Sequence, residues 1–69
     1  MEPVTIICDK KNSIESLKEI VLQHSEKGYD FVLINFSNGD AFAMTLNRFQ
    51  EMQFSGVIKQ LTFKQRQGK

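Results

Sequence analysis

The sequence predicts a small α+β domain with the element order β-α-β-β-(short α)-β and a mostly antiparallel sheet of about four strands packed on one main helix. Two observations carry this prediction. Residues 13–27 place apolar side chains at helical spacing, and residues 31–46, FVLINFSNGDAFAMTL, form two apolar runs around an Asn-Gly pair that favours a hairpin turn. We expect residues 1–69 to form a single domain, because the chain contains no repeat, linker or low-complexity stretch.

The first strand and the main helix follow from local composition. Residues 4–8, VTIIC, are rich in β-branched side chains, which are typical of a strand. Asn12 followed three residues later by Glu15 fits a capping box, so the helix is expected to begin at Ser13. Gly28 suits the left-handed conformation that ends many helices. The apolar stripe of this helix consists of Ile14, Leu17, Ile20, Val21 and His24.

The hairpin is expected to join strands at about 30–37 and 40–46 through a two-residue turn. Asn38-Gly39 is the preferred pair for a type I′ turn, in which both residues have positive φ. This turn places Phe36 opposite Ala41, and a four-residue loop would preserve the same pairing.

The register decides which hairpin residues share a face, since directly opposed residues lie on the same side of a sheet. One face carries Val32, Ile34, Phe36, Ala41, Ala43 and Thr45. The other carries Phe31, Leu33, Asn35, Phe42, Met44 and Leu46. Both faces are apolar, and the main helix covers only one of them. We therefore expect one of the two sets to be an interaction surface, most simply between two copies. The set with Phe42 is favoured, because the small alanines of the other set leave room for a closely packed helix. The alternative is that the short helix and its loops cover the remaining face.

The short helix is expected over residues 46–54, LNRFQEMQF, with Thr45 or Asn47 as its N-cap. Residues 57–65, VIKQLTFKQ, predict a last strand with one wet face. In this strand one face is expected to carry Val57, Lys59, Leu61 and Phe63, and the other Ile58, Gln60, Thr62 and Lys64. The element order resembles the ferredoxin-like split β-α-β arrangement. A helix packed on a meander is the alternative, and the strand order stays open.

The residue content argues against catalysis and cofactors. Cys8 is the only cysteine and His24 the only histidine, so a disulfide is excluded and a four-ligand metal site is not expected. No pair of carboxylates, no nucleophile with a base and no glycine-rich phosphate loop is visible. We expect a protein that is not an enzyme and holds no cofactor, with His24 and Cys8 as packing residues.

Charge is segregated along the chain. Residues 1–51 have a net charge of −3 and residues 52–69 a net charge of +4. The basic residues of the second segment are Lys59, Lys64, Arg66 and Lys69. They are candidate nucleic-acid contacts. A sheet with Phe31, Phe36, Phe42 and Phe63 invites comparison with RNA-binding platforms, in which sheet aromatics stack on bases, but no segment matches their basic, glycine- and aromatic-rich motif and the acidic first half would repel phosphate. The simpler interpretation is a solvated basic tail, expected to fray at 65–69.

These observations favour a small, non-enzymatic protein-interaction module. We expect a homodimeric regulator or inhibitor of a protein target, of the compact type common among phage and mobile-element accessory proteins. A weak nucleic-acid-binding protein that uses the basic segment is the alternative. The single cysteine, the lack of a signal-peptide layout and the lack of a membrane-spanning apolar run predict a cytoplasmic location without membrane contact.

Overall fold

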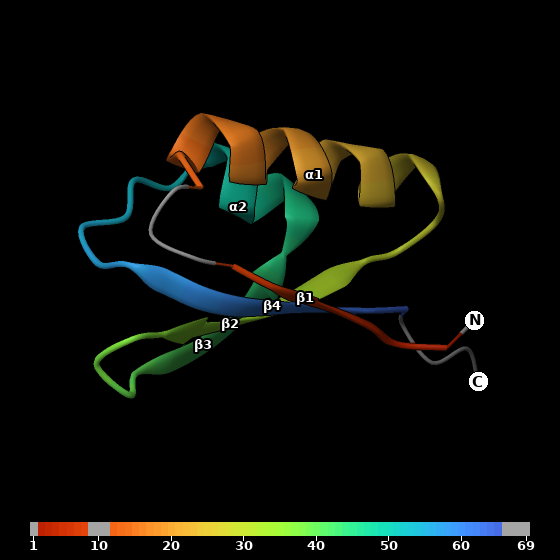
Figure 1. The fold of residues 1–69 in the computed structure, drawn as a ribbon. Coiled ribbons are helices and arrows are strands. Elements are labelled where there is room, and N and C mark those ends of the chain that lie inside the picture. Colours follow the sequence, from red (N-terminus) through yellow and green to blue (C-terminus); the bar gives the residue numbers. More distant parts are fainter. Residues whose placement is uncertain (1, 9–11, 66–69) are drawn as a thin grey trace.

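Both helices lie on one face of a four-stranded antiparallel sheet (Figure 1). The structure is a computed structural model that describes residues 2–8 and 12–65. The strands are β1 (Val4–Ile7), β2 (Phe31–Phe36), β3 (Ala41–Thr45) and β4 (Ile58–Lys64), and the helices are α1 (Ile14–Glu26) and α2 (Leu46–Glu51). The predicted α+β class and element order are confirmed. We call the side of the sheet opposite to the helices the open face.

The strand order is β1-β4-β2-β3, with every neighbouring pair antiparallel. Strand β4 therefore separates β1 from β2, and β2 separates β3 from β4. Both helical connections are split β-α-β units, which excludes the meander. The order differs from the ferredoxin-like fold, in which the first and third strands are central, because here these two strands form the edges.

The helices begin at hydroxyl caps, one of which differs from the prediction. The Ser13 hydroxyl accepts a hydrogen bond from the Ser16 N–H at 3.1 Å, so Ser13 itself caps α1 and the predicted capping box on Asn12 is wrong by one residue. Helix α2 is capped by Thr45, whose hydroxyl accepts from the Arg48 N–H at 3.1 Å. Of the two expected caps for α2, the structure uses Thr45.

Helix α1 ends in a Schellman motif at Gly28, as the sequence indicated. Gly28 has φ of 104°, and its N–H donates to the Ser25 carbonyl at 3.1 Å. The Tyr29 N–H donates to the His24 carbonyl at 3.1 Å. These two bonds satisfy carbonyls that would otherwise lack partners at the helix end.

One apolar core fills the space between the sheet and the helices. Its buried members are Cys8, Leu17, Val21, Tyr29, Val32, Ile34, Phe36, Leu46, Phe49, Ile58, Leu61 and Phe63. The predicted stripe of α1 supplies Leu17 and Val21. The centre of the sheet supplies most of the rest, because β2 and β4 have a strand on each side.

The hairpin loop is one residue longer than predicted, and this shifts the register. The Phe36 N–H donates to the Asp40 carbonyl at 2.8 Å, and the Gly39 N–H donates to the Phe36 carbonyl at 3.0 Å. Gly39 has φ of 98°, whereas no non-glycine residue in the described ranges has a positive φ. A three-residue loop ending in a left-handed glycine fits this pattern, and the type I′ turn is wrong. Ala41 therefore pairs with Asn35, not with Phe36.

A shift of one residue moves every side chain of a strand to the other face. Phe42 and Met44 now lie opposite Ile34 and Val32, on the side of the helices. The hairpin residues on the open face are Phe31, Leu33, Asn35, Ala41, Ala43 and Thr45. The predicted interaction face of Phe31, Leu33, Asn35, Phe42, Met44 and Leu46 is thus divided between the two sides, and Leu46 is buried in α2.

A bulge in β4 produces a second departure from simple alternation. Phe36 pairs with Ile58 and Asn35 pairs with Gln60, so Lys59 has no opposite residue on β2. The bulge turns Ile58 into the core and leaves Val57 exposed. The predicted sharing of one face by Val57, Lys59, Leu61 and Phe63 is wrong, because Ile58, Leu61 and Phe63 supply the buried side.

Candidate protein-interaction surface

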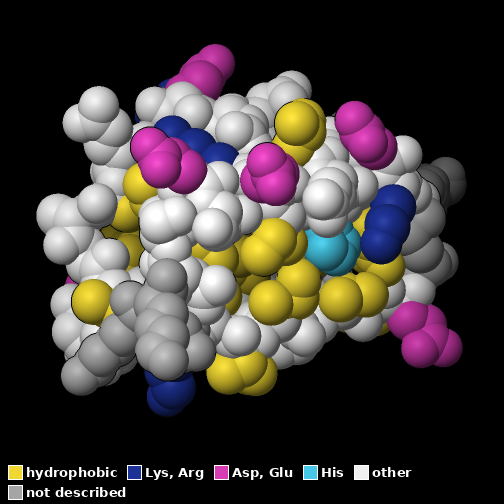
Figure 2. Space-filling model, turned by 45° about the horizontal axis from the view of Figure 1, so that its top comes forward, with side chains coloured by type: hydrophobic (Ala, Val, Ile, Leu, Met, Phe, Trp, Pro, Cys, Tyr) yellow, Lys and Arg dark blue, Asp and Glu magenta, His cyan; other side chains and the backbone are white. Residues whose placement is uncertain are grey.

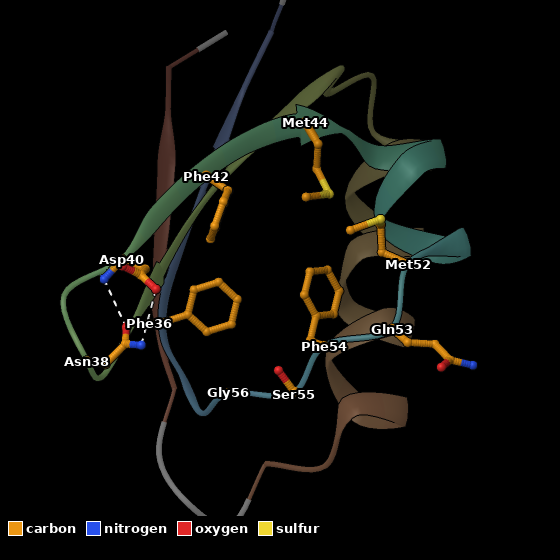
Figure 3. A pocket seen from close by; sticks show the side chains of 10 residues that line it. All are labelled: Phe36, Asn38, Asp40, Phe42, Met44, Met52, Gln53, Phe54, Ser55 and Gly56. Atoms are coloured by element: carbon orange, nitrogen blue, oxygen red, sulfur yellow. Dashed lines mark hydrogen bonds between the residues drawn. The ribbon is translucent and has the colours of Figure 1, made fainter.

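The early end of α2 leaves one end of the hairpin without a helical cover. The predicted helix over residues 46–54 ends at Glu51, and Met52 is already extended, with ψ of 153°. The following residues, 52–57, lead back to the sheet as an irregular segment. They pass beside the hairpin instead of closing over it, and the space between them forms an open groove (Figure 3).

This hairpin groove has a volume of about 280 Å³. Its apolar walls come from Phe36, Phe42, Met44, Met52 and Phe54, and its polar rim from Asn38, Asp40, Gln53 and Ser55. Figure 3 shows the side chains of Phe36, Phe42 and Met44 pointing into the space from the sheet, with Met52 and Phe54 facing them. The volume lies just below the range of roughly 300–1,000 Å³ typical of small-molecule pockets, so it suits one or two side chains of a partner.

An aromatic chain lines the groove and continues into the core. Phe42 meets the ring of Phe36 edge-on, with centroids 5.7 Å apart. Phe36 lies 6.0 Å from Phe54, and Phe54 lies 4.9 Å from the fully buried Phe49. Such ring pairs hold their members in defined positions. The inner part of the groove is therefore anchored to the core.

Gly56 allows the loop to approach the sheet closely. A Cβ at this position would lie 3.0 Å from Cδ1 of Phe36, which is too close without movement of that ring. Sequence analysis did not identify Met52, Phe54 or Gly56 as site residues. The sequence signal that could have found them is Phe54 followed directly by Ser-Gly, since Ser-Gly after a short helix indicates a turn that brings the chain back to the sheet.

Phe42 is the member of the groove that stands out most from the molecule. Its side chain is 53% exposed, whereas Phe36 beside it is 8% exposed. Phe42 lies on β3, which forms an edge of the sheet. A half-exposed aromatic ring on an edge strand is accessible to another chain or to a ligand.

The polar rim is organised by Asn38 and Asp40. The Asp40 N–H donates to Asn38 Oδ1 at 2.9 Å, and Asn38 Nδ2 donates to Asp40 Oδ2 at 3.2 Å. Asp40 is the one ionisable residue among those that line the groove. It places a negative charge at the hairpin end of β3.

The open face is more mixed than the sequence suggested. Phe31, Leu33 and Asn35 lie there on the central strand β2, where neighbouring strands leave them half-buried. Their cross-strand neighbours on β4 are Lys64, Thr62 and Gln60. The edge strand β3 contributes the small Ala41 and Ala43 to this face, and the edge strand β1 contributes the exposed Ile7.

The four phenylalanines considered as an aromatic platform for nucleic acid do not share one side of the sheet. Phe36, Phe42 and Phe63 face the helices, and of the four candidates only Phe31 lies on the open face. Among the basic residues, Lys59 and Lys64 are exposed on β4. Arg66 and Lys69 lie outside the described residues.

His24 is a packing residue in this structure. Its ring is buried and stacks on Phe63 with centroids 4.0 Å apart and planes 6° apart, while its Nδ1 lies 2.8 Å from the Ile20 carbonyl oxygen. Figure 2 shows it among apolar side chains at the surface of this view. Cys8, the only cysteine in the sequence, is also buried. In residues 2–8 and 12–65 no three metal-binding side chains come together.

Comparison with known proteins adds no relative: no protein-family model, curated protein or solved structure matches this chain. Within the described ranges, no helix is long and apolar enough to cross a membrane.

Proposed function

We propose that this chain is a non-enzymatic protein-interaction module that holds its partner at the hairpin end, in the role of a small regulator or inhibitor of a protein target. The observation that carries the proposal is the position of Phe42. It is half exposed, lines the hairpin groove and lies on an edge strand, so one surface offers an apolar anchor and a strand edge together.

The chemistry of the groove supports binding over catalysis. Its walls are phenylalanine and methionine, and methionine side chains adapt to different partner shapes. Asp40 is bonded to Asn38 and has no second ionisable residue beside it in the groove lining, whereas general acid–base chemistry depends on a suitably placed titrating group with a reacting partner. We propose the cytoplasm as its compartment, because a reduced thiol such as Cys8 is typical there.

The proposal is tested by comparing two variants as bait in cell lysate. Phe42→Asp removes the anchor, and Leu22→Asp is a matched control, because Leu22 is also 53% exposed but lies on α1. We expect wild type and Leu22→Asp to retain the same proteins, including untagged copies of the chain, and Phe42→Asp to lose them. Circular dichroism confirms that both variants are folded. Equal retention by all three baits would contradict the proposal.

A further inference from the structure

Strand β3 presents unpaired backbone groups along its outer side. The bond from the Phe36 N–H to the Asp40 carbonyl and the bond from the Leu46 N–H to the Asp30 carbonyl mark the two ends of the β2–β3 ladder. Since hydrogen-bonded and non-hydrogen-bonded pairs alternate in an antiparallel ladder, Phe42 and Met44 bond to β2. The N–H and C=O groups of the residues that alternate with them, such as Ala41 and Ala43, point away from the sheet.

This edge carries none of the usual features that prevent strand pairing. Edge strands are commonly interrupted by a charged residue, a proline or a bulge. The five residues of β3, AFAMT, contain no charge and no proline, and their pairing with β2 is regular from end to end. The opposite edge, β1, has four residues and follows Pro3. Edge β3 is therefore the better template for an added strand.

We propose that β3 pairs antiparallel with β3 of a second copy about a two-fold axis at Ala43, an inference that rests on the proposed function of the hairpin end. In this register Ala43 faces its own counterpart and all five residues of the strand are paired. Phe42 then lies opposite Met44 of the second copy, on the side of the helices. Each half-exposed ring is covered, and the two sheets join into one.

Charge complementarity favours a second copy over a foreign strand. Asp40 directly precedes β3, and Arg48 lies in α2, which directly follows it. In α2, Leu46 and Phe49 are buried and Gln50 faces α1, so the 100° rotation per residue leaves Arg48 on the side away from α1. Antiparallel pairing brings the Asp40 end of one strand to the Arg48 end of the other. The same match occurs twice, as two-fold symmetry requires.

The size of the chain gives a reason for this pairing. A domain of about 60 residues buries only about 60% of the surface of its unfolded chain and is marginally stable alone. Pairing would add backbone hydrogen bonds at Ala41 and Ala43 and would cover Phe42. The free energy of association would then contribute to the stability of each copy.

Exchanging the charges of Asp40 and Arg48 tests whether the partner is a second copy. Asp40→Arg and Arg48→Asp each place like charges together in both symmetric contacts, and the double variant restores opposite charges across the interface. Sedimentation equilibrium should give a dimer dissociation constant about tenfold weaker for each single variant, since two exposed ion pairs of up to about 1 kcal/mol each are lost. The double variant should return to the wild-type value. A double variant that is no tighter than the single variants would overturn the contact.

Cross-linking tests the register. Ala43→Cys should be joined to its counterpart by a short bismaleimide, whereas in Ala41→Cys the two thiols would lie roughly 13 Å apart along the strands and should not be joined. The wild-type protein, which contains only the buried Cys8, is the control for cross-linking through that native thiol. Equal cross-linking of both variants, or a monomeric wild type at all concentrations, would overturn the proposal. If the wild type is a monomer that still retains cellular proteins through Phe42, the pairing of two copies is excluded, but the proposed function stands.

Discussion

Lys18 and Gln50 join the two helices by exchanging hydrogen bonds between residues that are 32 positions apart in the sequence. Lys18 Nζ donates to the Gln50 carbonyl oxygen at 3.0 Å, and Gln50 Nε2 donates to the Lys18 carbonyl oxygen at 2.8 Å. Both residues are half-buried. The pair holds α2 beside α1, and α2 in turn determines where the segment with Met52 and Phe54 leaves the helix layer to form the hairpin groove.

Replacing Gln50 by alanine is expected to lower the free energy of unfolding by about 1 kcal/mol, the usual net value of a partly buried hydrogen bond. Urea denaturation measures this loss. Gln23→Ala is the matched control, because Gln23 is an exposed glutamine on α1. If both variants lost the same amount, the bond from Gln50 Nε2 to the Lys18 carbonyl would not contribute to stability.

Gly39 is expected to be the residue of the hairpin loop that tolerates substitution least. Its φ of 98° is unfavourable for other residues, and a Cβ there would have no atom within 4 Å, so any loss reflects backbone conformation alone. Gly39→Ala should cost about 1–2 kcal/mol of unfolding free energy. Gly39→Asn should cost less, because asparagine adopts the left-handed conformation more readily. Chemical denaturation of both variants checks the order, and an alanine variant as stable as wild type would contradict the loop geometry.

His24→Ala is expected to destabilise the protein by about 2 kcal/mol, because it removes a buried ring and leaves a cavity above Phe63. His24→Phe retains an aromatic ring in the stack and should recover most of the loss. Thermal unfolding followed by circular dichroism compares the two. An alanine variant with wild-type stability would show that the stacking of His24 on Phe63 does not contribute to the stability of the fold.

Nucleic-acid binding is expected to be weak and independent of base sequence, because the candidate aromatic platform does not exist on the open face. Any affinity should come from phosphate contacts of exposed lysines such as Lys59 and Lys64. It should therefore fall steeply as the salt concentration rises, and Lys59→Gln with Lys64→Gln should reduce it. Fluorescence anisotropy with oligonucleotides of different sequence measures both effects. Tight, sequence-dependent binding that persists in high salt would contradict this expectation.

The fold class could be predicted from the sequence because its signals are local. The apolar stripe of α1, the glycine at its end and the β-branched first strand each act within a few residues. The Asn-Gly pair likewise indicates the hairpin from a local signal. These elements depend little on the rest of the chain.

The register could not be predicted, because neither face of β3 is polar. Asn38-Gly39 is compatible with a two-residue turn and with a three-residue loop that ends at Gly39, and these differ by one residue. A strand with one polar face would have excluded one of them. In AFAMT, alanines alternate with Phe42 and Met44, so both registers bury apolar side chains.

The groove could not be predicted either, because it depends on where α2 ends and on contacts between distant residues. Phe36 and Phe54 meet only after the chain returns past Gly56. The bulge at Lys59 is likewise a property of the pairing of β4 with β2. In the sequence alone, residues 52–54 are a plausible continuation of the short helix. Residues 57–65 are a plausible regular strand without a bulge.

The most direct test of the interaction surface is amide hydrogen exchange along β3, measured residue by residue by NMR at increasing protein concentration. At low concentration the amides of Phe42 and Met44, which bond to β2, should exchange slowly, and those of Ala41 and Ala43 should exchange quickly. As copies associate, the amides of Ala41 and Ala43 should become protected to the level of their neighbours. If they stay fast at every concentration while the β2–β3 ladder remains protected, the edge of β3 does not pair with a second copy.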